Sequence, residues 1–556
     1  MPRSRQACSA KRAFVGKVFA SKPPLHRSAR RRVMRLHSTS LFLALLLSGP
    51  VAHPSPAAEY DVTRFGAVGD NLTLNTRAIQ RAIDACATGG GGIVRIPAGT
   101  FRTGTIVLRS QVTLYLEPGA VLVGSTQLQD YPSHIPGYRS YADNYTERSL
   151  IYAEKAEGIA IRGSGVIDGQ GKAFAGPYKA RPYLVRFIEC RHVTVEGVTF
   201  RDSPMWIQHY LACEDVVIHA IRVHSKANRN NDGIDIDGCC RVRISDCEIS
   251  SGDDAIVLKA TSGRPCRDVT ITNCVLSSDC NAIKLGTESN GGFQNIVISN
   301  CAISDTRLSG LALEEVDGGT LERLIATNLV MDGVGCPIFV RLGNRARPYK
   351  PDEPKPKVGA LRDVLISKVV AVARDYTGCS ITGIPGHRVE NVILRDIRVH
   401  FPGGGGPAHV TRSIPENEAK YPEHTMFGVL PAYGLFLRHV RNLTLENVQL
   451  ELDGADARPA LVAWDAEGLV MDGVSAAAPT GDSPLLWFSS LSAARIRDCL
   501  APEGVGVFLK LDGSRCADIV LTENDLRRAA KPLLAGPDVP KDAVLLMDNL
   551  LPPENR

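Results

Sequence analysis

Short segments in which apolar and polar residues alternate recur along most of the chain. Clear copies begin at Val193, Val242, Val269 and Ile296, and weaker copies continue as far as residues 519–526. Alternation with a period of two is typical of β-strands that bury one face. The copies follow one another every roughly 22–28 residues, which is the length of one coil of a parallel β-helix. The pattern therefore predicts an all-β solenoid, a single-stranded parallel β-helix.

The chain before these copies has a different pattern. In Thr76–Ala87 the apolar residues fall at helical spacing, and Asn75 and Gly89 bound the run. This predicts a short amphipathic helix, which would cap the exposed first coil of the solenoid. Three long interruptions rich in polar and turn-forming residues are residues 126–150, 341–360 and 401–434. In solenoids such insertions form loops, often on the binding face.

Residues 1–58 differ from the rest of the chain in charge. They hold 11 of the 64 Lys and Arg residues and none of the 59 Asp and Glu residues. The remainder carries six more acidic than basic side chains, which gives no general reason to expect nucleic-acid binding. Basic residues, the apolar core Leu41–Leu47 and small residues before position 59 together fit a secretory signal, with Met34 as an alternative start.

We therefore predict a signal peptide and basic leader over residues 1–58, and one β-helix domain over residues 59–556. The expected location is secreted or periplasmic. The apolar core of the leader is too short to span a bilayer, and no later apolar stretch is long enough, so we expect no membrane span. We expect a monomer.

Seven of the fifteen Cys residues fall into two columns of the predicted solenoid. Cys190, Cys213, Cys239 and Cys266 each lie three residues before the start of a copy, and Cys247, Cys274 and Cys301 each lie five residues after one. The preferred interpretation is free thiols stacked in the core, although the spacing of adjacent coils also allows disulfides. No group of Cys and His has the spacing of a zinc site, and we predict neither a metal nor another cofactor.

Acidic residues recur at matching points of two successive copies. Asn230-Asn231-Asp232 precedes one copy, and Gly252-Asp253-Asp254 precedes the next, 22 residues later. Because neighbouring strands lie about 4.8 Å apart, Asp232 and Asp254 should be neighbours, with Asp253 beside them. Crowded carboxylates shift one another's pKa. The cluster is therefore a candidate for acid–base catalysis.

Several further motifs stand in a fixed order between Tyr60 and Met331. They are Phe65–Asp70, Gly90–Gly99, Gly165–Gly171, Arg181-Pro182 and Ser203–Trp206. Asn230-Asn231-Asp232 and Gly252-Asp253-Asp254 complete the set. Together these motifs resemble glycoside hydrolase family 28, the polygalacturonase family, in which the last two motifs read Asn-Thr-Asp and Gly-Asp-Asp. The resemblance implies a right-handed β-helix and an inverting hydrolase that cleaves pectin-type, galacturonate-containing polysaccharides without a metal.

The resemblance also implies roles for the three aspartates. In an inverting glycosidase one carboxylic acid protonates the leaving oxygen, and carboxylate on the other side activates a water molecule. By position in the motifs, Asp253 would be the general acid. Asp232 and Asp254 would hold and deprotonate the water.

Two motifs of the family are replaced in this chain. The Gly-His-Gly position reads Cys280-Asn281-Ala282, and the Arg-Ile-Lys position reads Ala312-Leu313-Glu314. In family members the Arg and Lys bind the substrate carboxylate, and the His supports the acid. The replacement of Lys by Glu reverses a charge, so we expect an exo-acting enzyme or one for branched pectin such as rhamnogalacturonan.

Two lysines are candidates to replace the missing cations. Alternation along the strands places Asp235, Val257, Lys284 and Ala312 in one outward row, and Asp237, Lys259, Gly286 and Glu314 in the next. The predicted substrate-binding residues are Lys259, Lys284, Asn281, Asp235 and Glu314. A charge ladder, in which Lys259 pairs with Asp237 and Glu314, is an equal alternative. Arg341 and Arg345 follow shortly, and Trp206 and His209 either line the cleft or are buried.

Two other classes of function fit parts of the pattern. A β-helix polysaccharide lyase would use calcium held by carboxylates and a Lys or Arg base, for which Lys259 and Lys284 are candidates. A non-catalytic carbohydrate-binding β-helix would explain the replaced motifs. The trio of Asp232, Asp253 and Asp254 favours the hydrolase, because nothing structural requires three adjacent carboxylates.

Overall fold

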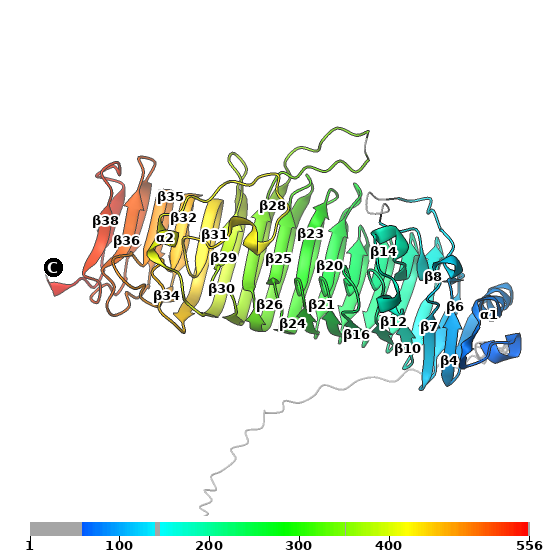
Figure 1. The fold of residues 1–556 in the computed structure, drawn as a ribbon. Helices are drawn as coiled ribbons and strands as arrows, with labels where there is room; N and C mark the ends of the chain where they lie inside the picture. The colour runs from blue at the N-terminus through cyan, green and yellow to red at the C-terminus, as the bar shows by residue number, and fades with distance from the viewer. Residues whose placement is uncertain (1–57, 140–144, 351, 554–556) are drawn as a thin grey trace, which may run out of the picture. The chain divides into compact units, whose positions relative to one another are not determined.

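The computed structural model describes residues 58–139, 145–350 and 352–553. Residues 1–57 of the expected signal peptide and leader lie outside the described residues. Over the described part the chain winds into a parallel β-helix, and every pairing between its strands is parallel. Figure 1 shows the coils stacked in chain order from the blue N-terminal region to the red C-terminal strands. The predicted all-β solenoid is confirmed.

Each coil contributes strands to three parallel ladders. The first ladder comprises β5 (Ile106–Val107), β8 (Ser149–Glu154), β11 (Tyr183–Ile188), β14 (Gln208–Leu211), β17 (Ile234–Asp237), β20 (Ile256–Ala260), β23 (Ile283–Ser289), β25 (Ser309–Glu315), β27 (Cys336–Leu342), β29 (Cys379–Thr382), β31 (Leu435–Leu452), β32 (Leu461–Glu467), β35 (Leu486–Arg497), β36 (Val507–Asp512) and β38 (Lys531–Ala535).

The second ladder comprises β1 (Glu59–Asp61), β3 (Gly92–Ile96), β6 (Val112–Leu116), β9 (Ala160–Gly163), β12 (Arg191–Glu196), β15 (Glu214–His219), β18 (Cys240–Ser245), β21 (Cys266–Thr272), β24 (Phe293–Ser304), β26 (Thr320–Val334), β28 (Ala360–Ala373), β30 (Val389–Phe401), β31, β33 (Val470–Asp472), β35, β37 (Ala517–Thr522) and β39 (Val544–Met547).

The third ladder begins with β2 (Asp70–Leu74), β4 (Gly99–Thr103), β7 (Ala120–Gly124), β10 (Val166–Asp168), β13 (Thr199–Arg201), β16 (Arg222–Ser225), β19 (Glu248–Ser251) and β22 (Val275–Ser278). It continues in the long strands β24, β26, β28, β30 and β31, which also belong to the second ladder. It ends with β34 (Ser475–Ala476).

Identical positions of successive coils stack in register inside the β-helix. Val193, Val216, Val242 and Val269 are consecutive partners, and all are buried. The polar residues between them face outwards, as in β18, where buried and exposed residues alternate. The core is therefore built from columns of like side chains, which explains why the pattern repeats so regularly along the sequence.

Two smaller predictions about the coils are also confirmed. Asn273 and Asn300 adopt the left-handed conformation that their turn position requires, each with φ of 56°. The side chain of Asn300 donates a hydrogen bond to that of Asn273 at 3.3 Å. Both Cys columns are buried, and the fourteen described cysteines are free thiols, so the stacked-thiol interpretation holds and the disulfide alternative is wrong for these residues.

Helix α1 (Thr76–Thr88) closes the N-terminal end of the core, as predicted. Its apolar face, which includes Ile79, Ala82 and Ile83, is buried in the main hydrophobic core. The short helix α2 (Pro407–Val410) lies between β30 and β31, and single 3-10 turns lie at Val62–Phe65, Leu128–Asp130, Gly171–Ala173, Tyr178–Ala180 and His424–Phe427. Within the described residues we find no helix with the length and apolar character that crossing a membrane demands.

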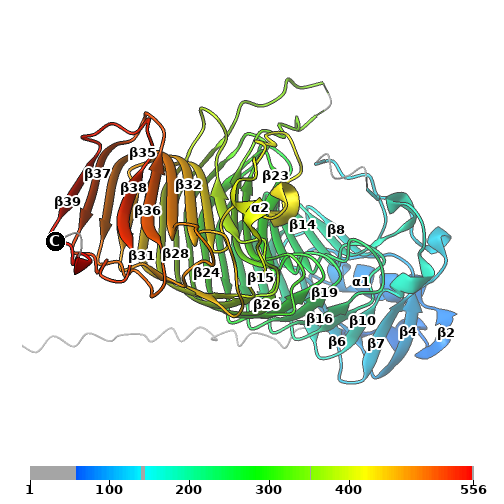
Figure 2. The same cartoon turned by 60° about the vertical axis from the view of Figure 1, so that its left-hand side comes forward.

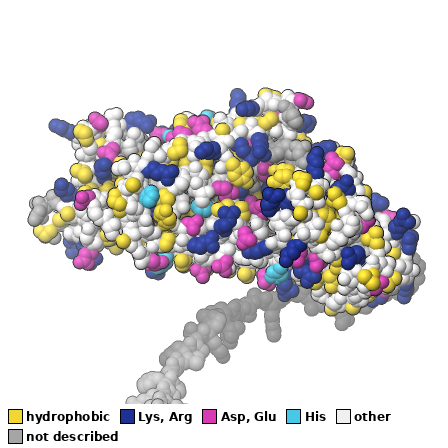
Figure 3. All heavy atoms as spheres, in the orientation of Figure 1, with side chains coloured by type: hydrophobic (Ala, Val, Ile, Leu, Met, Phe, Trp, Pro, Cys, Tyr) yellow, Lys and Arg dark blue, Asp and Glu magenta, His cyan; other side chains and the backbone are white. Residues whose placement is uncertain are grey.

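The three predicted interruptions are loops that lead out of the strand ladders. They separate β7 from β8, β27 from β28, and β30 from β31. Two of them meet, because the Tyr349 hydroxyl donates a hydrogen bond to the Arg139 carbonyl oxygen. In Figures 1 and 2 the loop between β27 and β28 and the loop before β8 rise on the same side of the β-helix. On the face that Figure 3 displays, acidic and basic side chains are interspersed.

Candidate active site

Three polar residues occupy the same turn position in successive coils, just before β17, β20 and β23. They are Asp232, Asp254 and Asn281. The backbone N–H after Asp232 donates to the carbonyl oxygen of Asp254 at 2.9 Å, and the N–H after Asp254 donates to that of Asn281 at 2.9 Å. The strand register thus fixes these side chains one above the other, as the motif spacing indicates for Asp232 and Asp254.

Asp253 lies beside this stack and is the most accessible member of the carboxylate trio. It is half-buried, whereas Asp232 and Asp254 are only 3% and 4% exposed. Its carbonyl oxygen accepts hydrogen bonds from the hydroxyls of Ser251 at 2.6 Å and Ser278 at 2.7 Å. These bonds tie its backbone to two neighbouring coils, so the carboxyl group is held at the surface of the site.

The turn before β17 is fixed by buried side chains. Asn231 donates to the carbonyl oxygens of Ser203 at 2.8 Å and Met205 at 3.1 Å. The Arg181 guanidinium donates to the side-chain oxygen of Asn230 at 3.0 Å. Because Arg181 and Asn231 are almost entirely buried, the position of Asp232 is set by the scaffold rather than by solvent.

The three carboxyl groups have different proton affinities. Burial and the neighbouring Asp254 raise the pKa of Asp253 above its ordinary value. Burial and Asp253 raise the pKa of Asp232 well above its ordinary value. Burial opposes ionisation of Asp254 too, but Lys284, Lys259 and Asn281 outweigh it and lower the pKa of Asp254. The site therefore combines two carboxyl groups with raised pKa, Asp253 and Asp232, with one whose pKa is lowered, Asp254.

Lys259 holds one group of carboxylates. Its ammonium lies 3.8 Å from Asp232, 3.6 Å from Asp235 and 3.4 Å from Glu288. It also sits 4.7 Å from the centre of the Trp206 ring. Asp235, which is fully buried, can act on the site only through this lysine. The alternative charge ladder, in which Lys259 pairs with Asp237 and Glu314, is not found among the described residues; Asp237 accepts instead from the Thr261 hydroxyl at 2.5 Å.

Lys284 holds a second group. Its ammonium lies 3.1 Å from Glu423, 3.6 Å from Asp254 and 3.7 Å from Glu314. The Tyr421 hydroxyl is 3.4 Å away. Glu314 is fully buried and burial raises its pKa well above its ordinary value, so it has no surface with which to touch a substrate in this structure. The predicted row of Asp235, Val257, Lys284 and Ala312 is observed as consecutive partners in register, but all four residues are buried, so the row is not exposed as predicted.

Asn281 connects the second group to the carboxylate trio. Its side-chain amide donates to Asp254 at 2.8 Å and lies 3.3 Å from a Glu423 oxygen, and its backbone N–H donates to Asp254 at 3.1 Å. It thus holds Asp254 as the ionised carboxylate. The structure brings all the predicted site residues together, with Asn281 and Lys284 at the Asp254 side and Lys259 at the Asp232 side.

Sequence reasoning missed three residues that complete the site, Glu288, Tyr421 and Glu423, and it named Arg345 only as a cation that follows shortly. Arg345 binds Asp317 and lies 3.8 Å from Glu288. Glu423 and Tyr421 come from the loop between β30 and β31, far from Lys284 in sequence. The only signal available was that this long insertion belonged to a class that often lies on the binding face.

Other flanking candidates are structural. Trp206 is 4% exposed and His209 is fully buried, with its Nε2 atom 3.4 Å from an Asp237 oxygen. Arg341 is buried and donates to the carbonyl oxygens of Gly383 at 2.9 Å and Glu416 at 2.7 Å.

A metal fits this cluster poorly. Ligand atoms of Asp253, Asp254 and Cys280 lie within 4.8 Å of one another. Burial raises the pKa of the Cys280 thiol, which disfavours the thiolate that soft metals require, and calcium prefers oxygen ligands. Lys284 also lies 3.6 Å from Asp254 and competes for the same charge.

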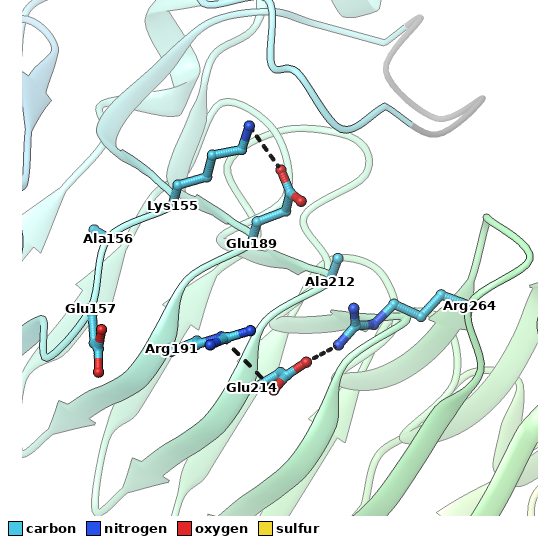
Figure 4. A pocket seen from close by; sticks show the side chains of 8 residues that line it. All are labelled: Lys155, Ala156, Glu157, Glu189, Arg191, Ala212, Glu214 and Arg264. Atoms are coloured by element: carbon cyan, nitrogen blue, oxygen red, sulfur yellow. Dashed lines mark hydrogen bonds and ion pairs between the residues drawn. The ribbon is translucent and has the colours of Figure 1, made fainter.

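A separate polar hollow of about 320 Å³ lies at the corner between the first and second ladders (Figure 4). Its three cations are Lys155, Arg191 and Arg264, and each lies within 4.0 Å of Glu189 or Glu214. The hollow contains none of the trio, and its charges neutralise one another.

Known proteins with the same features were found by sequence and by structure. The chain is 35% identical over 213 residues to a probable polygalacturonase from Vitis vinifera, and 30% identical over 258 residues to an exo-poly-alpha-D-galacturonosidase from Dickeya chrysanthemi. These matches cover 35% and 37% of this chain, and 43% and 42% of the two relatives. The chain thus spans less than half of their length.

Two solved structures have a similar fold. An exopolygalacturonase from Thermotoga maritima superimposes with a TM-score of 0.57 at 23% identity, covering 72% of this chain and 93% of that chain. A family 28 exopolygalacturonase from Yersinia enterocolitica superimposes with a TM-score of 0.53 at 22% identity, covering 79% and 78%. These likenesses support the right-handed parallel β-helix. The model of the glycosyl hydrolases family 28 matches residues 86–418, which is more than half of the chain and includes Asp232, Asp253 and Asp254; the chain belongs to this family.

Proposed function

We propose that the protein is a secreted or periplasmic, inverting glycoside hydrolase that cleaves glycosidic bonds in pectin-type polysaccharides. The observation that carries the proposal is the pairing of a partly buried Asp253, whose pKa is raised, with a buried Asp254, whose pKa is lowered. Two neighbouring carboxyl groups whose pKa values are pushed in opposite directions suit the acid and base roles of glycoside hydrolysis.

The chemistry needs only these carboxyl groups and water. Asp253 gives its proton to the glycosidic oxygen as the bond from that oxygen to the anomeric carbon breaks. Asp254 takes a proton from a water molecule that attacks the anomeric carbon from the opposite face, so the configuration inverts. Asp232 orients the water; its Oδ1 atom is buried and has no hydrogen-bond partner among the described residues.

Action at chain ends is favoured over cleavage inside long chains. The contact between Tyr349 and the Arg139 carbonyl oxygen joins loops that rise beside the first ladder, and Glu423 reaches the site from a third loop. Loops that join beside the site would restrict the passage of a continuous polymer. The relative from Dickeya chrysanthemi bears the name exo-poly-alpha-D-galacturonosidase, which agrees with this mode.

The lysine environments argue against a polysaccharide lyase. A lyase base must lose its proton near neutral pH. Burial alone would lower the pKa of Lys284, but Asp254, Glu314 and Glu423 raise it well above its ordinary value. Glu288 and Asp235 likewise raise the pKa of Lys259, which burial would lower. Both lysines remain ammonium ions and are poor bases.

The test is hydrolysis of a panel of homogalacturonan, saturated oligogalacturonides and rhamnogalacturonan fragments by residues 59–556. Release of reducing ends without an ultraviolet-absorbing unsaturated product, lost in Asp253→Asn, is the expected result. Asp305→Asn is the matched control, since Asp305 is exposed and already adopts a left-handed φ of 44° that Asn accepts. Absorbing products would establish a lyase, and binding without turnover would establish a carbohydrate-binding role.

A further inference from the structure

The three described cations that lie within ion-pair distance of the carboxylate cluster, Lys259, Lys284 and Arg345, are each bound to protein carboxylates. Lys259 and Lys284 each lie within 3.8 Å of three of them, and Arg345 binds Asp317 and approaches Glu288. A polysaccharide carboxylate needs a cation that it does not have to share. Around Lys259 and Lys284 the site therefore lacks the unopposed positive charge that a galacturonate residue would require.

Protonation of some of these carboxyl groups does not leave the two lysines with an excess of positive charge. Burial alone would raise the pKa of Glu288, but Lys259, Arg345 and Lys284 lower it to about 2. The pKa of Asp254 is lowered as well. Ionised Asp254 and Glu288 thus match Lys284 and Lys259 one for one, even when every carboxyl group with a raised pKa is counted as neutral. A substrate carboxylate would be an additional negative charge.

Glu423 occupies the position beside Lys284 that a bound uronate would need. Its carboxylate is 3.1 Å from the ammonium and 3.3 Å from the Asn281 amide. The flanking residues Pro422 and His424 are buried, so Glu423 is held between two anchored residues. Lys284 therefore has a built-in anionic partner.

Resting on the function proposed above, we infer that the sugar residue bound beside Lys259, Lys284 and Glu423 is uncharged. It carries no free carboxylate where galacturonate has one, so it is either a neutral sugar or an esterified uronate. The exposed ring of Tyr421, 55% accessible and 5.2 Å from the Lys284 ammonium, supplies an aromatic face of the kind on which sugar rings pack.

The test uses three substrates that differ in one group. They are an oligogalacturonide, its methyl ester, and the same chain after its carboxyl groups are reduced to hydroxymethyl groups. We expect kcat/KM, measured by reducing-end release, to be at least about ten-fold higher for one of the uncharged forms, equivalent to ~1.4 kcal/mol. A preference for the methyl ester would indicate an esterified uronate, and a preference for the carboxyl-reduced chain would indicate a neutral sugar.

A variant separates the charge effect from other causes of preference. Glu423→Gln removes one of the three carboxylates at Lys284 and should raise the activity on the uronate relative to the uncharged forms by about ten-fold. Glu416→Gln is the control, because Glu416 lies in the same loop but contacts Arg438 and His439 instead. It should leave the ratio unchanged.

Binding distinguishes failure of this inference from failure of the proposed hydrolysis. Affinities of Asp253→Asn for the three substrates can be measured by calorimetry without turnover. Tighter binding of an uncharged form by a protein that hydrolyses nothing would keep the inference and overturn the hydrolase. Preference for the free uronate, absence of binding by the uncharged forms, or an unchanged ratio in Glu423→Gln would overturn the inference.

Discussion

Replacing Lys284 by methionine should expose how strongly the site depends on one buried charge. The lysine side chain is 1% exposed, and those of its partners Asp254, Glu314 and Glu423 are 6%, 0% and 17% exposed. Methionine keeps the volume and removes the charge. Removing one partner of a buried ion pair costs about 3–5 kcal/mol, because the other partner is left uncompensated. We expect a loss of that size in the free energy of unfolding near neutral pH.

The pH dependence gives the prediction its sign. The pKa of Asp254 is lowered from 3.8 in the folded protein, so the stabilisation it provides is present above pH 3.8 and is lost as the pH falls through the folded pKa. The pKa of Lys284 is raised above 10.5, so its contribution is present below pH 10.5. The destabilisation by Lys284→Met should therefore be large at pH 6 and should shrink below pH 3.8.

Urea unfolding at pH 6 and pH 3, followed by circular dichroism, measures this difference. Lys226→Met is the matched control, because Lys226 makes one ion pair with Asp279 in which the side chains are 41% and 52% exposed. An exposed pair contributes only about 0–1 kcal/mol. A loss in Lys284→Met no larger than in Lys226→Met, or a loss of equal size at both pH values, would refute the reasoning.

Three further outcomes follow from the same geometry. Asp253→Asn should lower kcat by about 10²–10⁴-fold, as expected for loss of a general acid; residual activity within ten-fold of the parent protein would contradict the assignment. The pH–rate profile should be bell-shaped, with an acid limb below pH 3.8 from Asp254 and an alkaline limb above pH 3.8 from Asp253; a flat profile from pH 3 to 8 would contradict it. Asn281→Leu removes the side-chain amide that donates to Asp254 and should move the acid limb to higher pH, and an unmoved limb would show that the lysines and the retained backbone N–H set that pKa.

The sequence predicts the β-helix and most of the site for one physical reason. Stacking in register turns a recurring position in the chain into a column in space, so Val193 and Val216 meet in the core just as Asp232 and Asp254 meet at the turn. Spacing along the chain is therefore enough to place neighbours. The same reasoning places Lys284 beside Ala312, which the register confirms.

The rest of the site could not be predicted, because its residues leave the repeat. The register between β20 and β23 shifts after Leu258, where Ala260 pairs with Ser289, and this shift brings Glu288 to Lys259. Glu423 lies 139 residues after Lys284, in an insertion whose path no periodic pattern specifies. Charge partners that come from irregular segments are visible only in the folded structure.

The replaced motif explains why the protein keeps the family's scaffold while its site differs in charge. The resemblance to the family implies two cations at positions 312 and 314, and the chain has Ala312 and Glu314 there. The cation stands one strand earlier, at Lys284, in register with Ala312 and 3.7 Å from Glu314. A lysine bound to a neighbouring glutamate stabilises Asp254 but offers little to an external anion. The same aspartate trio can thus be retained for bond cleavage while the charge that would select a uronate is neutralised within the protein.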